Sequence, residues 1–342
     1  MAQRPGPASF FTVVMLVAGL LLAAMPHAEA DRLDSILARG ILICGLVESG
    51  PGLAEQSGVS EVWRGFDIDA CAAMAAAMVG DAKAFELVAL DPKAATSALA
   101  EGQVDLLVRA VPRGIRQRLQ AELLFTAQGL MVRRGSGPRN FAGLSGQAVC
   151  VQNGETRQRL TAYLTRNEPS TQVFGFPSLK QAALSFIGGA CAAVSGPRIE
   201  LALIRRELEQ TPRSFELIGE LMDLAPSGPI VAPGEERLGQ AVRWIVFSLL
   251  EAERLGVTRR SLADDADVAQ HENPAVARLL GAGGHLDALG LPEGWSRRAI
   301  AAVGNYKEVY DRHLGALSPL RLERGPNALQ EEGGLLLLPS MQ

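Results

Sequence analysis

The chain has 342 residues, of which 48% are hydrophobic and 20% charged, so it can form two domains that each bury an apolar core. It carries 33 basic and 37 acidic side chains, a formal net charge of −4 and a sequence pI of about 5.7. Because the electrostatic footprint of nucleic-acid binders is basic, this balance argues against a nucleic-acid partner.

The first 30 residues have the pattern of a secretory signal rather than of folded structure. Arg4 supplies a positive start, residues 10–24 form an apolar run, and Ala28-Glu29-Ala30 matches a small-x-small cleavage site. A retained membrane anchor is the alternative, but it needs about 20 apolar residues and this run is shorter. We therefore expect residues 1–30 to be removed on export, with the mature chain beginning near Asp31.

The chain contains four cysteines: Cys44, Cys71, Cys150 and Cys191. An even number in an exported chain indicates disulfides, and four cysteines allow three pairings. Cys44 and Cys71 fall in one predicted strand–helix unit, and the other two fall on later strands. We predict Cys44–Cys71 and Cys150–Cys191, with four buried thiols as the alternative. No close Cys/His spacing is present, so no zinc or other metal site is expected.

Strands alternate with helices of about ten residues along most of the chain, which predicts an α/β fold with parallel sheets. Strands are expected over residues 41–46, 85–90, 104–108, 148–152, 173–176 and 191–194, and helices over 31–38, 70–79, 92–102, 155–165, 178–186, 199–209 and 235–255. A crossing is expected at 130–133 and a return linker at 225–229. These two connections predict two lobes: residues 31–128 plus 229–342, and residues 129–228.

A basic turn follows one buried strand, in the segment VDLLVRAVPRGIRQR at residues 104–118. The apolar run breaks at Pro112 and Gly114. The turn carries Arg109, Arg113, Arg116 and Arg118. Open α/β sheets bind small molecules at the carboxyl edge of their strands, so this turn is a candidate binding site; a solvated charge run is the alternative. No GxGxxG follows a strand and no GxxxxGK[ST] occurs, so no nucleotide cofactor is expected.

Four segments resemble one family, the periplasmic solute-binding proteins of polar and general L-amino-acid ABC transporters. They are GFDIDAC (65–71), AEGQVDLLVR (100–109), VCVQNGETR (149–157) and AVGNYKEVYDRHLGALSPLRLERGPNALQEEGGL (302–335). The last is similar to the C-terminal signature of the general L-amino-acid branch, and all four cysteines fall where that branch places them.

The resemblance implies a clamshell, a bilobal periplasmic-binding-protein fold of two doubly wound sheets. The hinge crossings would lie near residues 127–131 and 226–231, and closure would trap a solute between the lobes. It also implies a periplasmic protein, monomeric by default, that docks on an ABC transporter permease in the inner membrane.

The ligand site departs from the family pattern at its two charge anchors. A buried zwitterion needs a cation for its carboxylate and an anion for its ammonium. The resemblance places the carboxylate-binding arginine at Gln117, between Arg116 and Arg118, and the ammonium-binding aspartate at Pro197. Glu155 and Glu200 are the other candidate anions.

Further departures lie in the loops of both lobes. Ala110 and Val111 replace polar donors in the first lobe, and Glu155 replaces a threonine in the second. An arginine cluster without a matching carboxylate favours an amino-acid-like or anionic ligand. The expected ligand-binding residues are Arg109, Arg113, Arg116, Arg118, Gly154, Glu155, Thr156 and Ser195.

Three functions fit these observations. The first is the binding component of an amino-acid-type ABC transporter. The second is a diverged sensor or partner module, suggested by the changes at Ala110, Val111 and Pro197. The third, a small-molecule dehydratase on the same scaffold, needs a titratable group in the cleft, for which Glu155 is the one candidate. We therefore expect a binding protein rather than an enzyme.

Overall fold

The computed structural model describes residues 31–47, 50–56, 62–111, 118–208, 214–264, 273–282 and 289–339. The predicted signal segment lies outside the described residues, as do Arg113 and Arg116 of the basic turn. None of the helices in the described ranges is long and apolar enough to span a bilayer.

The described strands form one continuous sheet and a small hairpin. The strands are β1 (Leu42–Leu46), β2 (Glu55–Gln56), β3 (Trp63–Arg64), β4 (Phe85–Ala89), β5 (Leu106–Ala110), β6 (Leu124–Arg133), β7 (Ala148–Gln152), β8 (Gln172–Phe176), β9 (Ala193–Pro197), β10 (Phe215–Leu217) and β11 (Met222–Val231). In the sheet the order is β4-β1-β5-β11-β6-β9-β7-β8, with β10 also on β6, and β2 pairs with β3. The triplets β4-β1-β5 and β8-β7-β9 are each parallel, as the alternation predicts.

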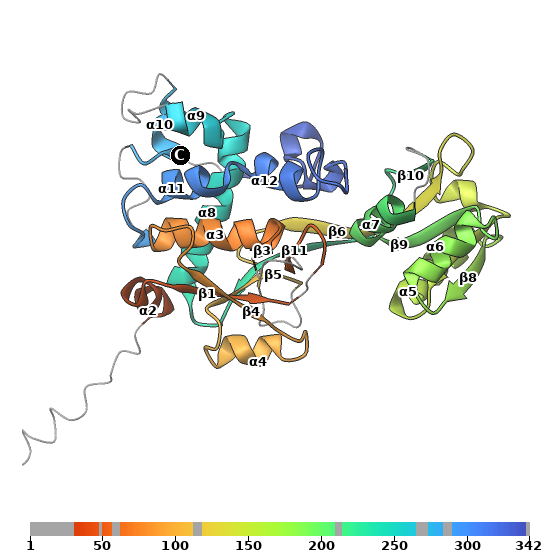
Figure 1. Cartoon of the computed structure of the whole chain (residues 1–342), viewed down its shortest axis with the longest axis horizontal. Helices are drawn as coiled ribbons and strands as arrows, with labels where there is room; N and C mark the ends of the chain where they lie inside the picture. Colours follow the sequence, from red (N-terminus) through yellow and green to blue (C-terminus); the bar gives the residue numbers. More distant parts are fainter. Residues whose placement is uncertain are drawn as a thin grey trace, which may run out of the picture.

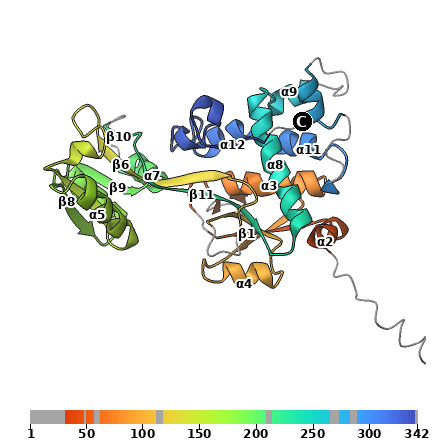
Figure 2. The same cartoon turned by 180° about the vertical axis from the view of Figure 1, so that it is seen from behind.

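Two long strands connect the halves of this sheet. β6 pairs antiparallel with β11 from Leu124 to Gln128, and then with β9 from Gln128 to Val132. β11 pairs with β6 in its first part and with β5 from Gly228 onward. Figures 1 and 2 show these two strands running between two separate bodies. The predicted hinge crossings therefore exist as a paired ribbon.

The prediction of a linker at residues 225–229 missed a strand, because this segment lies within β11. Two prolines suggested a linker, since proline cannot donate a ladder hydrogen bond. β11 accommodates Pro229 at the register shift between Gly228 and Ile230. It accommodates Pro226 opposite Phe125, because the Phe125 N–H and carbonyl bond Asn327.

Helices cover the sheet in each body. The α-helices are α2 (Arg32–Arg39), α3 (Phe66–Met78), α4 (Ala95–Ala100), α5 (Glu155–Asn167), α6 (Leu179–Ile187), α7 (Arg198–Leu208), α8 (Glu236–Arg254), α9 (Arg259–Asp264), α10 (Pro274–Leu279), α11 (Trp295–Val303) and α12 (Tyr306–His313), and the 3₁₀ turns are η1 (Ala142–Leu144), η4 (Gly325–Asn327) and η5 (Gln330–Glu332). α6 begins at Ser178, as predicted, because the Ser178 hydroxyl accepts the Gln181 backbone N–H.

The apolar residues collect into clusters on either side of the crossing strands. The largest packs α3, α8, α11 and α12 around Phe66, Ile245 and Trp295. Two smaller clusters flank the second half of the sheet, one around Phe141 and one around Phe186. These clusters agree with two lobes, and the boundaries at residues 128 and 228 stay predictions.

The two predicted disulfides are confirmed. Cys44 on β1 is bonded to Cys71 on α3, and Cys150 on β7 is bonded to Cys191, two residues before β9. The first therefore joins a strand to a helix that packs on it, and the second joins β7 to the approach to its neighbouring strand β9.

The C-terminal segment returns to the crossing strands (Figure 2). The Tyr306 hydroxyl donates to the Leu123 carbonyl at 2.9 Å. The Asn327 amide accepts from the Phe125 backbone N–H at 2.6 Å and donates to the Phe125 carbonyl at 3.1 Å. Arg324 forms a two-pronged ion pair with Glu253. The start of β6 is thus held by side chains from the chain end.

Removing either disulfide is expected to lower the free energy of unfolding. The bonds close loops with sequence separations of 27 and 41 residues. The chain-entropy relation gives about 3.5 kcal/mol for the pair Cys44→Ala/Cys71→Ala and about 4 kcal/mol for Cys150→Ala/Cys191→Ala. Urea unfolding of each double variant measures these losses, with the reduced wild-type chain as control. A loss below about 1 kcal/mol in both variants would contradict this account.

Candidate ligand-binding cleft

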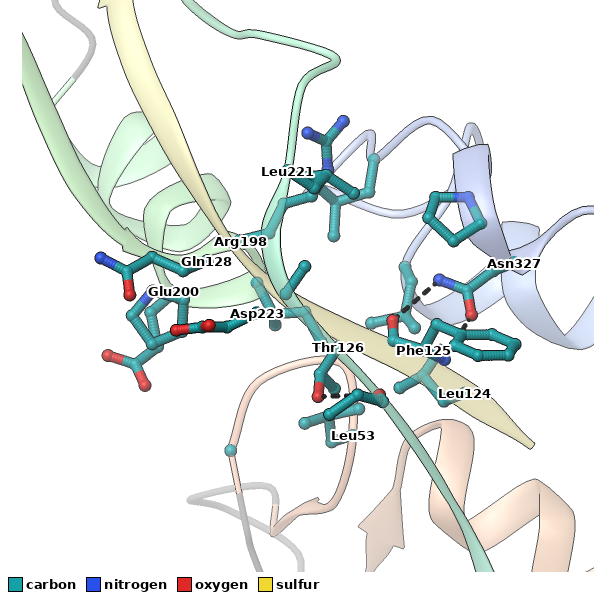
Figure 3. Close-up of a pocket in the computed structure, with 18 of the residues that line it drawn as sticks. Leu53, Leu124, Phe125, Thr126, Gln128, Arg198, Glu200, Leu221, Asp223 and Asn327 are labelled. Atoms are coloured by element: carbon teal, nitrogen blue, oxygen red, sulfur yellow. Dashed lines mark hydrogen bonds between the residues drawn. The ribbon is translucent and has the colours of Figure 1, made fainter. Parts of the chain in front are cut away.

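A cavity of about 880 Å³ lies between the two bodies (Figure 3). This volume is in the range of small-molecule sites. The first lobe contributes Pro51, Leu53 and Arg109, and the crossing strands contribute residues 124–128 and Asp223. The first turns of α5 and α7, including Thr156 and Glu200, and the C-terminal segment around Glu323 and Asn327 complete the wall.

Arg109 borders the cavity but is already engaged by a carboxylate. It lies within β5, not in the turn as expected, because the strand runs two residues further than predicted. Its Nε donates to Asp67 Oδ1 at 2.8 Å and to Oδ2 at 3.2 Å. Both side chains are 2% exposed, and Asp67 stands in the first turn of α3, where the helix dipole favours an anion. The pair is therefore a buried ion pair at the cleft wall.

The structure describes one of the other three predicted arginines. Arg118 is exposed and does not line the cavity. Arg113 and Arg116 lie outside the described residues. Their role as ligand-binding residues stays a prediction.

In the second lobe, Glu155 and Thr156 line the cavity at the start of α5. Gly154 precedes them with φ of 105°, a conformation that suits glycine, and it opens the helix. The Glu155 side chain is 78% exposed and pairs with Arg159 at 2.9 Å. Arg159 also contacts Asp223 Oδ2 at 3.0 Å, so one guanidinium is shared by two carboxylates.

Ser195 is fully buried and does not line the cavity. Its hydroxyl accepts from Gln128 Nε2 at 2.9 Å and donates to the Gly129 carbonyl at 3.1 Å. Both bonds are internal, so the geometry gives Ser195 the role of supporting Gln128 rather than of meeting a ligand.

Gln128, Arg159 and Asp223 line the cavity and were not among the predicted residues. Arg159 carried a signal, since it stands one helical turn after Glu155. Asp223 has φ of 50° at a register shift of β11, a strained conformation that Asp tolerates and that clusters at functional sites. Gln128 lies in the hinge crossing expected near residues 127–131, and nothing in the sequence marked its side chain as a ligand contact.

Arg198 also lines the cavity, but its guanidinium group is bonded to the protein backbone. Its Nη1 donates to the Ile218 carbonyl at 2.7 Å, and burial lowers the pKa of the guanidinium. Among the described residues no group of three His, Cys, Asp or Glu side chains can hold a metal ion.

Breaking the buried ion pair is expected to destabilise the fold strongly. Asp67→Ala leaves the Arg109 guanidinium buried without this carboxylate, at a cost of about 3–5 kcal/mol. Asp67→Ala/Arg109→Met removes both charges and should recover part of that loss. Glu155→Ala, which breaks an exposed pair, is the control and should cost less than about 1 kcal/mol. Chemical denaturation measures all three; a double variant no more stable than Asp67→Ala would refute the interpretation.

Comparison with known proteins places these observations in a family, although no family model matches the chain. The chain is 34% identical to the glutamate/glutamine/aspartate/asparagine-binding protein BztA of Rhodobacter capsulatus over 97% of this chain and 98% of that protein. It is 30% identical to the general L-amino acid-binding periplasmic protein AapJ of Rhizobium johnstonii, over 95% and 97% of the two chains.

A solved structure shares the architecture as well as the sequence. It is an ABC transporter periplasmic binding protein from Brucella ovis with glutathione bound, 31% identical, with a TM-score of 0.71 over 90% of this chain and 98% of that chain. This likeness confirms the bilobal fold class predicted from the sequence. The chain belongs to the family of periplasmic amino-acid-binding proteins of ABC transporters.

Proposed function

We propose that the chain is exported to the periplasm, captures an amino-acid-like or small anionic solute between its lobes, and delivers it to an inner-membrane ABC permease. Its relatives are periplasmic binding proteins of this kind. The predicted signal at residues 1–30 supports export, and the monomeric state expected from the resemblance belongs to the same proposal.

The observation that carries the proposal is the position of the cavity. It lies between two bodies joined by the paired strands β6 and β11, so a rotation at these strands brings both walls onto one ligand. A solute that contacts both lobes favours the closed form over the open form, and the permease can distinguish the two shapes.

The charges in the wall support a ligand with polar groups of both signs. Glu155, Glu200 and Asp223 supply carboxylates, and Arg109 and Arg159 supply guanidiniums. A desolvated amino acid or small acidic peptide needs partners of both kinds. The cavity of about 880 Å³ has room for a ligand larger than one amino acid, such as the glutathione held by the Brucella ovis relative.

The same geometry favours binding over catalysis. Glu155, the one candidate acid–base group found in the sequence, is exposed and paired with Arg159. A general acid or base is instead placed where it can reach the reacting proton and where water is excluded.

Ligand binding is expected to raise the unfolding temperature of the mature chain. At a ligand concentration of 100 times Kd the native state gains about 2.7 kcal/mol. Thermal-shift measurements with L-glutamate, L-glutamine, L-aspartate, L-asparagine and glutathione at near-millimolar concentration test this, with sucrose as the control. Small-angle scattering should show a smaller radius of gyration with any compound that raises the unfolding temperature. If no compound in the panel raises the unfolding temperature, the proposal is overturned.

A further inference from the structure

We propose that Gln128 on β6 and Asp223 on β11 form a subsite that receives a protonated amino group of the ligand. This inference rests on the proposed function and names which end of the solute faces the hinge. Four observations lead to it.

The first observation is a hydrogen-bond acceptor that is unsatisfied among the described residues. Gln128 is 5% exposed, lines the cavity, and its carbonyl oxygen Oε1 is buried with no hydrogen-bond partner among the described residues. A buried amide oxygen left unsatisfied destabilises the fold, so native structures seldom keep one without a purpose. A ligand N–H removes that cost.

The second observation fixes which way the amide faces. Nε2 of Gln128 donates to Ser195 Oγ at 2.9 Å and lies 3.4 Å from the Thr156 carbonyl. The Thr156 carbonyl can only accept, and the Ser195 hydroxyl proton is used on Gly129. The nitrogen must therefore face these groups, so the oxygen faces the opposite side.

The third observation is what lies on that side. Figure 3 shows the Gln128 oxygen turned toward the carboxylates of Glu200 and Asp223, with the nitrogen turned away from them. All three residues line one cavity. The unsatisfied Gln128 oxygen beside these carboxylates makes this part of the wall rich in acceptors, while Asp223 also pairs with Arg159. A compact cation such as an ammonium, with three donors, satisfies the arrangement.

The fourth observation is the place of Gln128 in the sheet. It is opposite Met222 of β11 and also opposite Pro197 of β9, so it stands where β6 changes partner. The Pro197 side chain offers no acceptor. Asp223 follows Met222 with φ of 50°, so this strained backbone directs a carboxylate to the same junction. A group bound here contacts the hinge itself.

The test compares ligands with and without an amine. L-Glutamate is paired with glutarate, L-aspartate with succinate, and glutathione with its N-acetyl form, and affinities are measured by titration calorimetry. The amine-bearing member should bind at least tenfold more tightly. Gln128→Met should weaken it about 10- to 100-fold, as expected for losing a hydrogen bond to a charged group, and should leave the amine-free analogue unchanged.

Two further variants separate recognition from structural damage. Asp223→Asn removes a carboxylate that is 39% exposed and pairs with Arg159. Glu216→Gln is the matched control, because it removes a carboxylate that is 37% exposed, pairs with Arg134 at 3.3 Å and lies outside the cavity. Asp223→Asn should lower affinity for the amine-bearing ligand, and Glu216→Gln should not. This comparison decides the matter even if Gln128→Met fails to fold.

The possible contrary results distinguish failure of the proposed function from failure of the amino-group subsite. If no compound binds the wild-type chain, the proposed function falls, and this subsite with it. If amine-bearing and amine-free partners bind equally, or if Gln128→Met and Asp223→Asn weaken both by the same factor, the solute-binding function stands and the amino-group subsite is overturned.

Discussion

The arrangement of the molecule depends on the backbone pairing between β6 and β11. Each strand begins in one half of the sheet and ends in the other, so the ladder between them is the connection shared by both lobes. At its lobe-one end β6 is held by Tyr306 and Asn327, which bond the Leu123 and Phe125 backbone groups. This end is therefore fixed, and bending must concentrate further along, near Gln128 and the register shift after Met222. The cavity opens at that place.

The electrostatics of the open cleft follow from this geometry. Arg109 is neutralised by Asp67, and Arg159 is shared between Glu155 and Asp223. The two groups of charges differ in their exposure to water. The side chains of Arg109 and Asp67 are each 2% exposed, whereas that of Arg159 is 47% exposed and exchanges partners at little cost. We infer that Arg109 shapes the wall, while the Arg159 group is the part that rearranges when a charged solute enters.

Much of the fold could be predicted because it depends on local pattern. One sequence is enough to recognise the alternation of strands and helices, the Ser178 cap and the cysteine positions. The strand at residues 225–229 was missed because proline usually ends strands, and its acceptance here depends on how β11 pairs with its neighbours. Arg109 was placed in the turn because the apolar run ends at Val108, whereas β5 continues to Ala110, which pairs with Gly228 of β11.

The binding site was less predictable because its chemistry comes from neighbours across the sheet. Ser195 was expected to meet the ligand since it adjoins Pro197 in sequence. In the structure Ser195 is opposite Leu130, and Gln128, its diagonal neighbour, covers it. Cross-strand neighbours of this kind are set by register, which a single chain does not reveal. For the same reason nothing in the sequence linked Gln128 with Asp223.

The sequence resemblance places an acid at residue 197, where this chain carries a proline that lines the cavity. Pro197 is half-buried, so a carboxylate at this position would be partly desolvated even when the site is empty, which raises its free energy. A neutral amide oxygen there costs much less, and the formal charge resides instead on Asp223, which is 39% exposed and stays hydrated until closure. A shared and hydrated charge in place of a buried one therefore leaves the hinge stable when the site is empty.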